Sequence, residues 1–314
     1  MNLYDQIQTH FHLPNAYEDW TNYRNTLTNY LITETNQLSL PLSFSNDFIN
    51  TIKLPTLAIL GAGSCNDFDL EKLSSHFSKI TLIDYDFPSM QKALSTYHLE
   101  QETDFIKPDL QTRKLQTAII EQIPVSLNGL DHSDYRRFCE QLQHYVQNCP
   151  SAFCLEDFTE YALSLLEKDY KKSRKTPIPL SPASYDYIVC FGVHSQLQAM
   201  YSYIYHIFEV NLNNQSTAPI QKDFISNRFF HRLQEENLVF IPKFHDALLS
   251  SAKHGIFLGC ELTNPNCDTP IEGAYQAITD IRKRNINLTE SVILWPFCPA
   301  RQITYEMLIQ KITL

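Results

Sequence analysis

A glycine turn between a short apolar run and a helical pattern is the feature that most restricts the fold of this chain. Residues 56–60, Thr-Leu-Ala-Ile-Leu, form the apolar run, and Gly61 and Gly63 follow it directly. An uninterrupted apolar run of this length is typical of a strand buried on both faces of a parallel sheet. Because the chain has only 7 glycines in 314 residues, two of them one residue apart indicate a sharp turn or close approach of the backbone to a ligand.

The residues after this turn alternate between helix and strand. Apolar positions spaced by three and four predict a helix over 67–77, and the apolar run at 80–83 predicts a strand that ends at Asp84. Pro88 then marks the start of another helix. Residues 56–98 therefore have the order strand, turn, helix, strand, helix, which is how a doubly wound α/β sheet begins.

The rest of the chain continues in the same way. Residues 15–35 are expected to be helical, and an N-terminal helical cap over 1–50 precedes the main domain at 51–314. That domain carries helical insertions near 131–175 and 211–253, and an exposed basic loop at 171–177. Further strands are expected at 119–127, 187–191, 256–260, 291–295 and 303–313, and further helices at 133–147, 155–171, 197–210, 222–236, 244–252 and 274–283.

Charge and cysteine content exclude several classes of protein. The net charge of -10 repels phosphate backbones, so no nucleic-acid partner is expected. No apolar run is long enough for a membrane span, and the first residues do not form a secretory signal. The 8 cysteines form no C-x-x-C pair, so we expect reduced thiols, a cytoplasmic location and no metal site.

The glycine turn and Asp84 together predict a nucleoside site. The helix after the turn offers unpaired N–H groups, and a carboxylate at the tip of the next strand can accept hydrogen bonds from both ribose hydroxyls. The dinucleotide fingerprint G-x-G-x-x-G would place a small residue where Asn66 stands. Asn66 therefore counts against a nicotinamide dinucleotide.

These residues resemble the class I S-adenosylmethionine-dependent methyltransferases. Residues 57–64 look like the glycine-rich motif I of that family, and 80–84 like the motif whose acid holds the ribose. Residues 128–130 fall where the third strand contacts adenine, 185–197 look like the fourth strand with its active-site loop, and 295–307 like the final hairpin. The resemblance implies an α/β fold with a doubly wound, mostly parallel seven-stranded sheet and an antiparallel final strand.

The resemblance also implies S-adenosyl-L-methionine as cofactor and a set of site residues. His194 is the candidate catalytic base or acceptor contact, and Gln196 and Glu261 are candidate substrate contacts. A small-molecule methyl acceptor is expected. The cofactor-binding residues are expected to be Leu60, Gly61, Ala62, Gly63, Ser64, Asp67, Asp84, Tyr85, Asp86, Asn128, Gly129, Leu130, Phe191, Gly192 and Val193.

Two positions depart from the family pattern. Ile59 stands where many members have an acid for the amino group of the cofactor, and Cys65 replaces the usual third glycine. Asp67 or Asp86 is a candidate to compensate electrostatically. A catalytically inactive nucleoside-binding or regulatory protein of the same fold, and an NAD-dependent oxidoreductase, remain as alternatives.

Several of these residues also have a structural interpretation. His194 is equally compatible with a loop histidine that makes a structural hydrogen bond, Ser195 with a helix cap, and Glu261 with an ordinary loop acid. Trp20 and Tyr23 are compatible with a lid over the cofactor or with a helix packed on the sheet edge.

Overall fold

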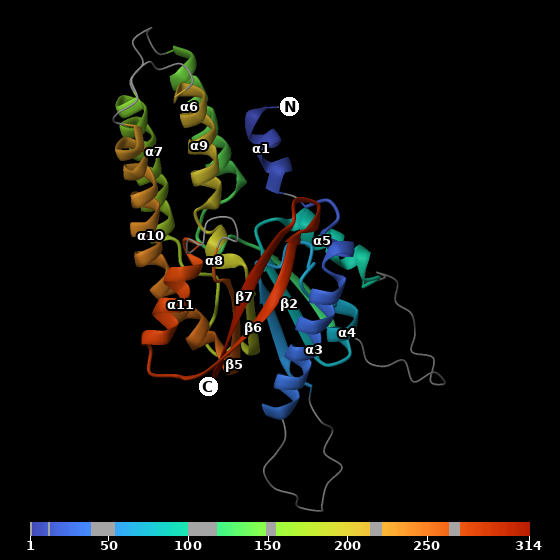
Figure 1. Ribbon diagram of the computed structural model, residues 1–314. Helices are drawn as coiled ribbons and strands as arrows, with labels where there is room; N and C mark the ends of the chain where they lie inside the picture. Colours follow the sequence, from blue (N-terminus) through green and yellow to red (C-terminus); the bar gives the residue numbers. More distant parts are fainter. Residues whose placement is uncertain are drawn as a thin grey trace, which may run out of the picture.

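The computed structural model describes residues 2–11, 13–38, 54–99, 118–148, 155–213, 222–263 and 271–314. Its centre is a seven-stranded sheet with the strand order β3-β2-β1-β4-β5-β7-β6 (Figure 1). Five strands pair in parallel, and β7 is antiparallel to both β5 and β6. The expected fold class, with an antiparallel final strand, is confirmed. The strands are β1 (Thr56–Leu60), β2 (Lys79–Asp84), β3 (Ile119–Pro124), β4 (Tyr185–Phe191), β5 (Ala252–Glu261), β6 (Asn287–Cys298) and β7 (Ile303–Thr313).

Helices cover both faces of the sheet. On one face, apolar side chains of the N-terminal helices and of the two helices that follow β1 and β2 share a core with Ile59 and Val189 of the strands. On the other face, the second half of a long helix and the helix after β5 pack on Leu60 and Leu258. The first group is α2 (Ala16–Asp19), α3 (Thr21–Leu38), α4 (Leu70–Ser74) and α5 (Phe87–Thr96), and the second is α10 (Lys222–Ser251) and α11 (Ala274–Lys283).

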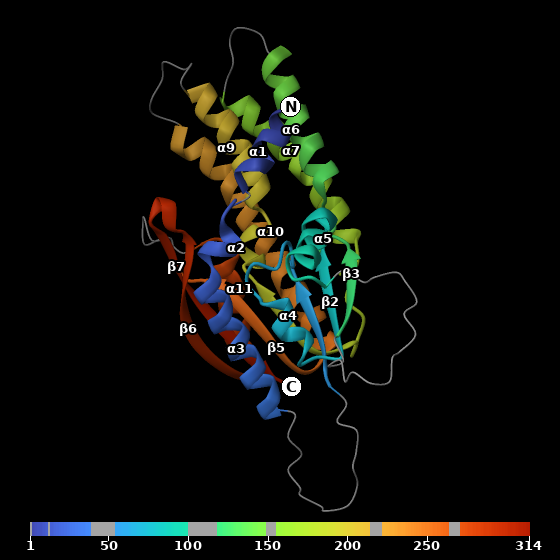
Figure 2. The same cartoon turned by 90° about the vertical axis from the view of Figure 1, so that its right-hand side faces the viewer.

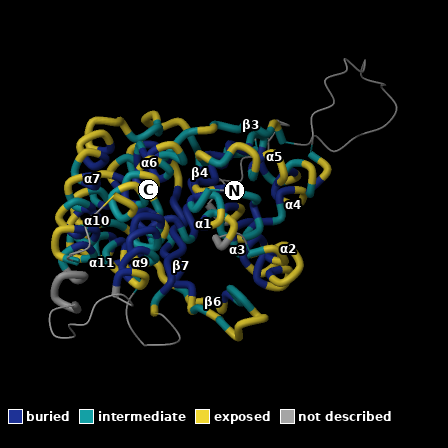
Figure 3. Tube along the Cα trace, turned by 90° about the horizontal axis from the view of Figure 1, so that it is seen from above, coloured by how far each residue is buried: buried dark blue, intermediate teal, exposed yellow. Residues whose placement is uncertain are grey.

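A helical bundle stands beyond the carboxyl ends of the parallel strands (Figures 1 and 2). Its separate core is rich in aromatic side chains, including Tyr4, Phe158, Tyr201 and Phe229. Seen from above, exposed residues lie mostly on the outer helices and along β6, and buried residues fill the centre (Figure 3). The bundle consists of α1 (Leu3–Phe11), α6 (His132–Asn148), α7 (Leu155–Lys175), α9 (Ala199–Asn213) and the first half of α10; α8 (Val193–Gln196) precedes α9, and a 3-10 turn (Pro299–Arg301) joins β6 to β7.

The predicted exposed loop at 171–177 is wrong over most of its length, because α7 runs on to Lys175. The basic side chains of this last turn have acidic partners on other helices. Lys172 Nζ lies 2.5 Å from Asp134 Oδ2, and Arg174 Nε donates to Glu236 Oε1 at 3.0 Å. These ion pairs, together with the favourable position of basic groups at a helix C-terminus, extend the helix.

The two helices predicted at 222–236 and 244–252 are one helix of 30 residues, α10, with Pro242 inside it. Ile241 and Phe244 on either side of the proline are fully buried in the sheet core, and this packing holds both halves in line. The helix predicted over 67–77 is correct only for 70–74, because Asp69 caps α4 by accepting a hydrogen bond from the Lys72 backbone N–H.

The division into a cap and a main domain at residue 50 stays a prediction, since 39–53 lie outside the described residues. The parts of the predicted insertions that are described form helices of the bundle. Within the described ranges, none of the helices has both the length and the apolar character that a bilayer crossing requires.

Candidate functional site

The strand order places a switch point between β1 and β4, because β2 and β3 extend the sheet to one side of β1 and β4 and β5 to the other. Ligands of doubly wound sheets bind in the crevice outside the carboxyl ends of the strands at such a point. The Gly61–Gly63 turn leaves β1 there. Residues 192–196 leave β4 beside the turn, and Val193 packs against Gly61. We use the name crest for this region at the carboxyl ends of β1 and β4, which includes residues 61–63 and 192–196.

The two glycines of the turn have left-handed backbones, with φ of 65° at Gly61 and 47° at Gly63. A Cβ at Gly61 would lie 2.3 Å from Val193 Cγ2, so only glycine allows the start of α8 to pack against the turn. A Cβ at Gly63 would meet no atom within 4 Å. The backbone at Gly63 is therefore open on the side where a ligand would approach. The other predicted residues of this segment, Leu60, Ala62 and Ser64, form the end of β1 and the turn itself.

Asp84 lies at the end of β2, beside the turn, as predicted. Its Oδ2 accepts a hydrogen bond from the Gly63 backbone N–H at 2.9 Å, and its Oδ1 accepts one from Asp86 N–H at 2.8 Å. Burial raises the pKa of this carboxyl, while the two backbone hydrogen bonds lower it. Each carboxylate oxygen can accept more than one hydrogen bond, so the oriented group retains capacity for ligand hydroxyls.

Tyr85 and Asp86, also predicted to bind the cofactor, have different positions. Asp86 caps α5 by accepting hydrogen bonds from Ser89 N–H at 3.2 Å and from Ser89 Oγ at 2.7 Å. Tyr85 is 38% exposed, and its ring packs edge-on against His132 with 4.6 Å between centroids. Since His132 Nδ1 lies 3.0 Å from the Tyr4 hydroxyl, α1 of the bundle borders this end of the crest.

Residues 128–130, which follow β3, make structural contacts with other parts of the protein. The Asn128 side chain donates from Nδ2 to the Leu197 carbonyl at 3.2 Å and accepts from Leu130 N–H at 3.0 Å. A Cβ at Gly129 would lie 2.7 Å from Thr176 Cβ, and Leu130 is buried in the bundle core. These side-chain contacts join β3 to the bundle, and the predicted adenine contacts of this segment stay a prediction.

Phe191, Gly192 and Val193 end β4 at the crest. The Phe191 ring packs edge-on against Phe68 at 5.5 Å, and a Cβ at Gly259 would collide with it. Gly192 has a φ of 63°. This left-handed residue turns the chain from β4 into α8, and so sets the direction of the four residues that follow.

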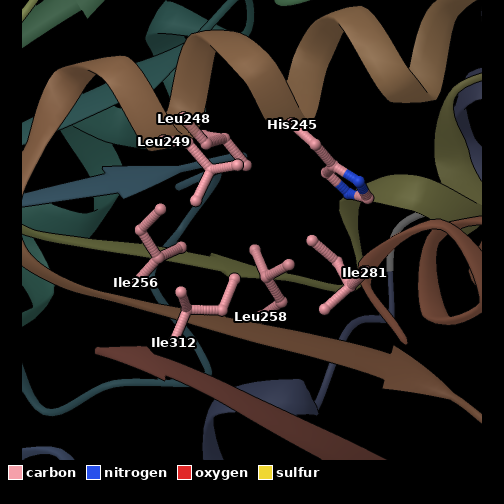
Figure 4. A pocket seen from close by; sticks show the side chains of 7 residues that line it. All are labelled: His245, Leu248, Leu249, Ile256, Leu258, Ile281 and Ile312. Atoms are coloured by element: carbon pink, nitrogen blue, oxygen red, sulfur yellow. The ribbon is translucent and has the colours of Figure 1, made fainter. Parts of the chain in front are cut away.

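His194 lies in a buried chain of polar groups. Its Nε2 is 3.0 Å from His245 Nε2, its Nδ1 is 3.6 Å from Cys260 Sγ, and His245 Nδ1 is 2.7 Å from Asp280 Oδ2. Burial lowers the pKa of both histidines. His245 also borders an apolar gap between α10, α11 and the sheet that is too narrow for a water molecule (Figure 4). Both nitrogen atoms of the His194 ring therefore have partners within the protein, as expected for a structural histidine. A catalytic role for His194 stays a prediction.

Glu261 and Asp67 meet on the α3 side of the crest. Glu261 is only 4% exposed, and its Oε1 accepts a hydrogen bond from Ser195 Oγ at 2.9 Å. Glu261 Oε2 is buried with no hydrogen-bond partner among the described residues. Burial is the main cause of a raised pKa in both groups, and with the charge of Glu261 it brings the pKa of Asp67 to about 7. Gln196, the third candidate substrate contact, is exposed.

Two aromatic residues, Tyr23 and Trp295, complete this region, and their pairing was not predicted from the sequence. Tyr23 of α3 lies close enough to Asp67 to lower the pKa of that carboxyl, although its hydroxyl has no hydrogen bond of normal geometry. The Trp295 ring of β6 stacks on Tyr23 with 6.0 Å between centroids, and its Nε1 is buried without a partner among the described residues. The sequence marked Trp20 and Tyr23 as lid or packing residues, and the structure shows that α3 packs on β6. The pairing with Trp295 joins positions far apart in the chain.

No group of three or more His, Cys, Asp or Glu side chains in the described ranges is arranged to hold a metal ion. The polar groups described at the crest are carboxylates, hydroxyls and backbone N–H groups. This donor set suits hydrogen bonding to an organic ligand with hydroxyl and cationic groups.

At the level of sequence, neither protein-family models nor curated proteins give a match. Among solved structures, the N-methyltransferase NodS of Bradyrhizobium japonicum WM9 with S-adenosyl-L-homocysteine is 11% identical, with 100% of this chain and 98% of that chain covered and a TM-score of 0.43. The magnesium protoporphyrin IX methyltransferase ChlM of Synechocystis PCC 6803 is 6% identical, with coverages of 94% and 99% and a TM-score of 0.38. The methyltransferase domain of bacterial CtHen1 is 11% identical, with coverages of 93% and 98% and a TM-score of 0.39. The likeness to these three methyltransferases is one of fold alone.

Proposed function

We propose that this chain binds S-adenosyl-L-methionine at the crest and transfers its methyl group to a small molecule. The observation that carries the proposal is the contact between Asp84 and the Gly63 backbone N–H at 2.9 Å, next to the switch point. This contact sets a fixed carboxylate beside a turn whose backbone is open to a ligand. An adenosine ribose offers two hydroxyl donors to such a carboxylate.

The residues present fit this cofactor. Asp84 would accept hydrogen bonds from the ribose, and the open backbone at Gly63 would face the ligand without a side chain in the way. The bound cofactor would supply an activated methyl group on a sulfonium, so the protein mainly has to position the acceptor in line with it.

A small-molecule acceptor is supported by charge and by the surroundings of the crest. The net charge of -10 disfavours a polyanionic substrate. The bundle stands over the carboxyl ends of the strands, and α2 and α3 cover the face next to β6 (Figure 2). The alternative of an NAD-dependent oxidoreductase is not favoured, because Asn66 occupies the position where the dinucleotide fingerprint requires a small residue.

The test is calorimetric titration of S-adenosyl-L-methionine, S-adenosyl-L-homocysteine and NAD into the wild type and Asp84→Ala. We expect both adenosyl ligands to bind the wild type, and the substitution to weaken them by about 1–3 kcal/mol through the loss of charge-assisted hydrogen bonds. NAD is expected not to bind.

Asp186→Ala is the matched control. The Asp186 carboxylate also holds a strand backbone, with Thr56 N–H at 2.8 Å, but at the opposite end of β1 and β4. This variant should lose stability and keep ligand affinity. Equal affinity of wild type and a folded Asp84→Ala variant would remove the ribose assignment, and binding of NAD alone would contradict the proposed function.

A further inference from the structure

We propose that the methyl acceptor is an alkylamine, and that Asp67 and Glu261 bind its ammonium group next to Tyr23 and Trp295. This inference rests on the proposed function, because it names the substrate class for the same crest. It starts from polar atoms that the fold buries and leaves without partners.

Tyr23 links these groups, because its hydroxyl interacts with Asp67 and Glu261 and its ring stacks on Trp295 with 6.0 Å between centroids. Glu261 closes β5, and a Cβ at Gly192 would lie 3.8 Å from its Oε1. The unpartnered Oε2 of Glu261, the Tyr23 hydroxyl and Trp295 Nε1 are all buried. Burial of polar groups without partners costs free energy, so a cluster of them at the mouth of a predicted binding crevice indicates a missing ligand.

The carboxyl groups of this cluster outnumber the cations that act on them. In the described part of the chain, neither Asp67 nor Glu261 forms a salt bridge. The charge of Arg24 lowers the pKa of Asp67, but the Arg24 guanidinium donates its hydrogen bonds to the carbonyls of Tyr17 at 2.8 Å and Asn66 at 3.3 Å. The other titratable groups that interact with the two carboxyls are Tyr23, Cys65 and Cys260. Since none of these is a cation, a positively charged ligand would gain the interaction that the fold leaves open.

An alkylammonium fits this cluster better than other cations. It has three N–H donors for the two carboxylates, and its carbon chain can lie against aromatic rings, which attract cations through their faces. Trp20 and Trp295 pack edge-on at 5.0 Å, and Tyr23 stacks on Trp295, so the aromatic wall is continuous. A metal ion would need more oxygen ligands than these two side chains offer.

The carboxylates of Asp67 and Glu261 can also accept the proton that an ammonium group must lose before it is methylated. An ammonium nitrogen has no free electron pair, so it must first give a proton to one of the carboxylates. The nitrogen then forms a bond to the methyl carbon as the carbon–sulfur bond breaks, and that electron pair returns to sulfur. The products are the thioether S-adenosyl-L-homocysteine and a methylated ammonium, and the carboxylic acid returns its proton to water.

The test compares the wild type with Glu261→Gln and with Glu290→Gln as matched control. Glu290 lies on β6, pairs with Arg282, and faces the opposite side of the sheet from Trp295. Two measurements are made on each variant. The first is the thermal midpoint with n-butylammonium chloride against equal concentrations of sodium chloride and of n-butanol, and the second is calorimetric titration of S-adenosyl-L-homocysteine and 5′-methylthioadenosine.

We expect butylammonium, but not butanol, to raise the midpoint of the wild type and of Glu290→Gln, and to have no effect on Glu261→Gln. Affinity for S-adenosyl-L-homocysteine should stay within about twofold in all three. Asp67→Asn repeats the test if Glu261→Gln does not fold. The absence of a butylammonium effect in the wild type, or an equal effect in Glu261→Gln, would overturn the proposal.

The second measurement separates the two sources of an ammonium group. If Glu261→Gln weakens S-adenosyl-L-homocysteine more than tenfold but leaves 5′-methylthioadenosine unchanged, the carboxylates bind the amino group of the cofactor, and the amine acceptor is refuted. If neither nucleoside binds the wild type, the proposed function fails, while the butylammonium comparison still decides whether an ammonium site exists.

Discussion

At the scale of single residues, the two glycines of the turn have different structural roles. Both have left-handed backbones, but a Cβ at Gly61 would lie 2.3 Å from Val193 Cγ2, whereas one at Gly63 would meet open space. Alanine at Gly63 therefore adds only backbone strain, of about 1 kcal/mol. Alanine at Gly61 adds the same strain and a clash between the turn and α8, and we expect it to lower the free energy of unfolding by about 2–4 kcal/mol.

Urea denaturation of Gly61→Ala and Gly63→Ala measures this difference directly. Each variant serves as the control for the other, because the same residue type is introduced two positions apart in one turn. Equal losses of stability in the two variants would show that the start of α8 yields to the extra methyl group, and that Gly61 does not fix the width of the crest.

The sequence predicted those residues whose role depends on near neighbours. Gly61, Gly63 and Asp84 are recognisable because a strand, a turn and an acid at a strand tip follow one another locally. Asn128 and His194 are different. The partners of their side chains include Leu197 and His245, which come from elements that only the folded chain brings together. The residue type alone did not separate a ligand contact from a structural hydrogen bond.

At the scale of elements, α7 and α10 are joined by ion pairs of unequal burial. Glu236 of α10 is 2% exposed and accepts hydrogen bonds from Arg174 Nε at 3.0 Å and Arg232 Nη2 at 3.2 Å. A second pair, Arg228 with Glu160, has side chains that are 40% and 54% exposed. Exposed pairs contribute little to stability, whereas removing one partner of a buried pair leaves the other charges without compensation.

We therefore expect Glu236→Gln to lower the free energy of unfolding by about 1–3 kcal/mol and Glu160→Gln to change it by less than about 0.5 kcal/mol. Urea denaturation followed by circular dichroism at 222 nm checks both values. A loss in Glu160→Gln as large as that in Glu236→Gln would contradict the view that burial decides the contribution of these pairs.

The same ion pairs explain which element boundaries were predicted wrongly. The central strands β1 and β4 were found from apolar runs, because a strand in the middle of a sheet is buried along its own length. The edge strand β6 is partly exposed and runs over Asn287–Cys298, so the prediction of 291–295 covered only its middle. The basic side chains in the last turn of α7 led to the prediction of an exposed loop. This turn is stabilised by ion pairs with acidic side chains of α6 and α10. Separate helices were likewise predicted at 222–236 and 244–252, while the core on either side of Pro242 keeps α10 continuous.

At the scale of the whole molecule, α10 connects the bundle to the sheet. Its 30 residues extend about 45 Å. Phe229 and Leu233 lie in the bundle core, and Ile241, Phe244 and Leu248 lie in the core under the sheet. The mostly parallel seven-stranded sheet with its antiparallel final strand followed from the family resemblance, but the position of the bundle over the crest did not, because the insertions have no counterpart in the motifs. Because α10 belongs to both cores, it couples the unfolding of the bundle to that of the sheet.

We expect the bundle and the sheet to unfold in one transition. The two tryptophans of the chain, Trp20 and Trp295, pack 5.0 Å apart on the face of the sheet remote from α10, so their fluorescence reports the cap and the β6 edge. Circular dichroism at 222 nm reports the helices of the bundle together with those that cover the sheet. Because loss of either core removes half of the packing of α10, the urea midpoints from the two probes should coincide in the wild type.

Leu238→Pro is the variant that separates the two parts. Leu238 is 63% exposed and lies between the two halves of α10, so its side chain contributes little packing, while a proline there interrupts the helix at a cost of about 3 kcal/mol. We expect the fluorescence and dichroism midpoints to separate in Leu238→Pro and to coincide in the control Leu238→Ala. Separate midpoints already in the wild type would show that the bundle and the sheet are independent cooperative units, and that α10 does not couple them.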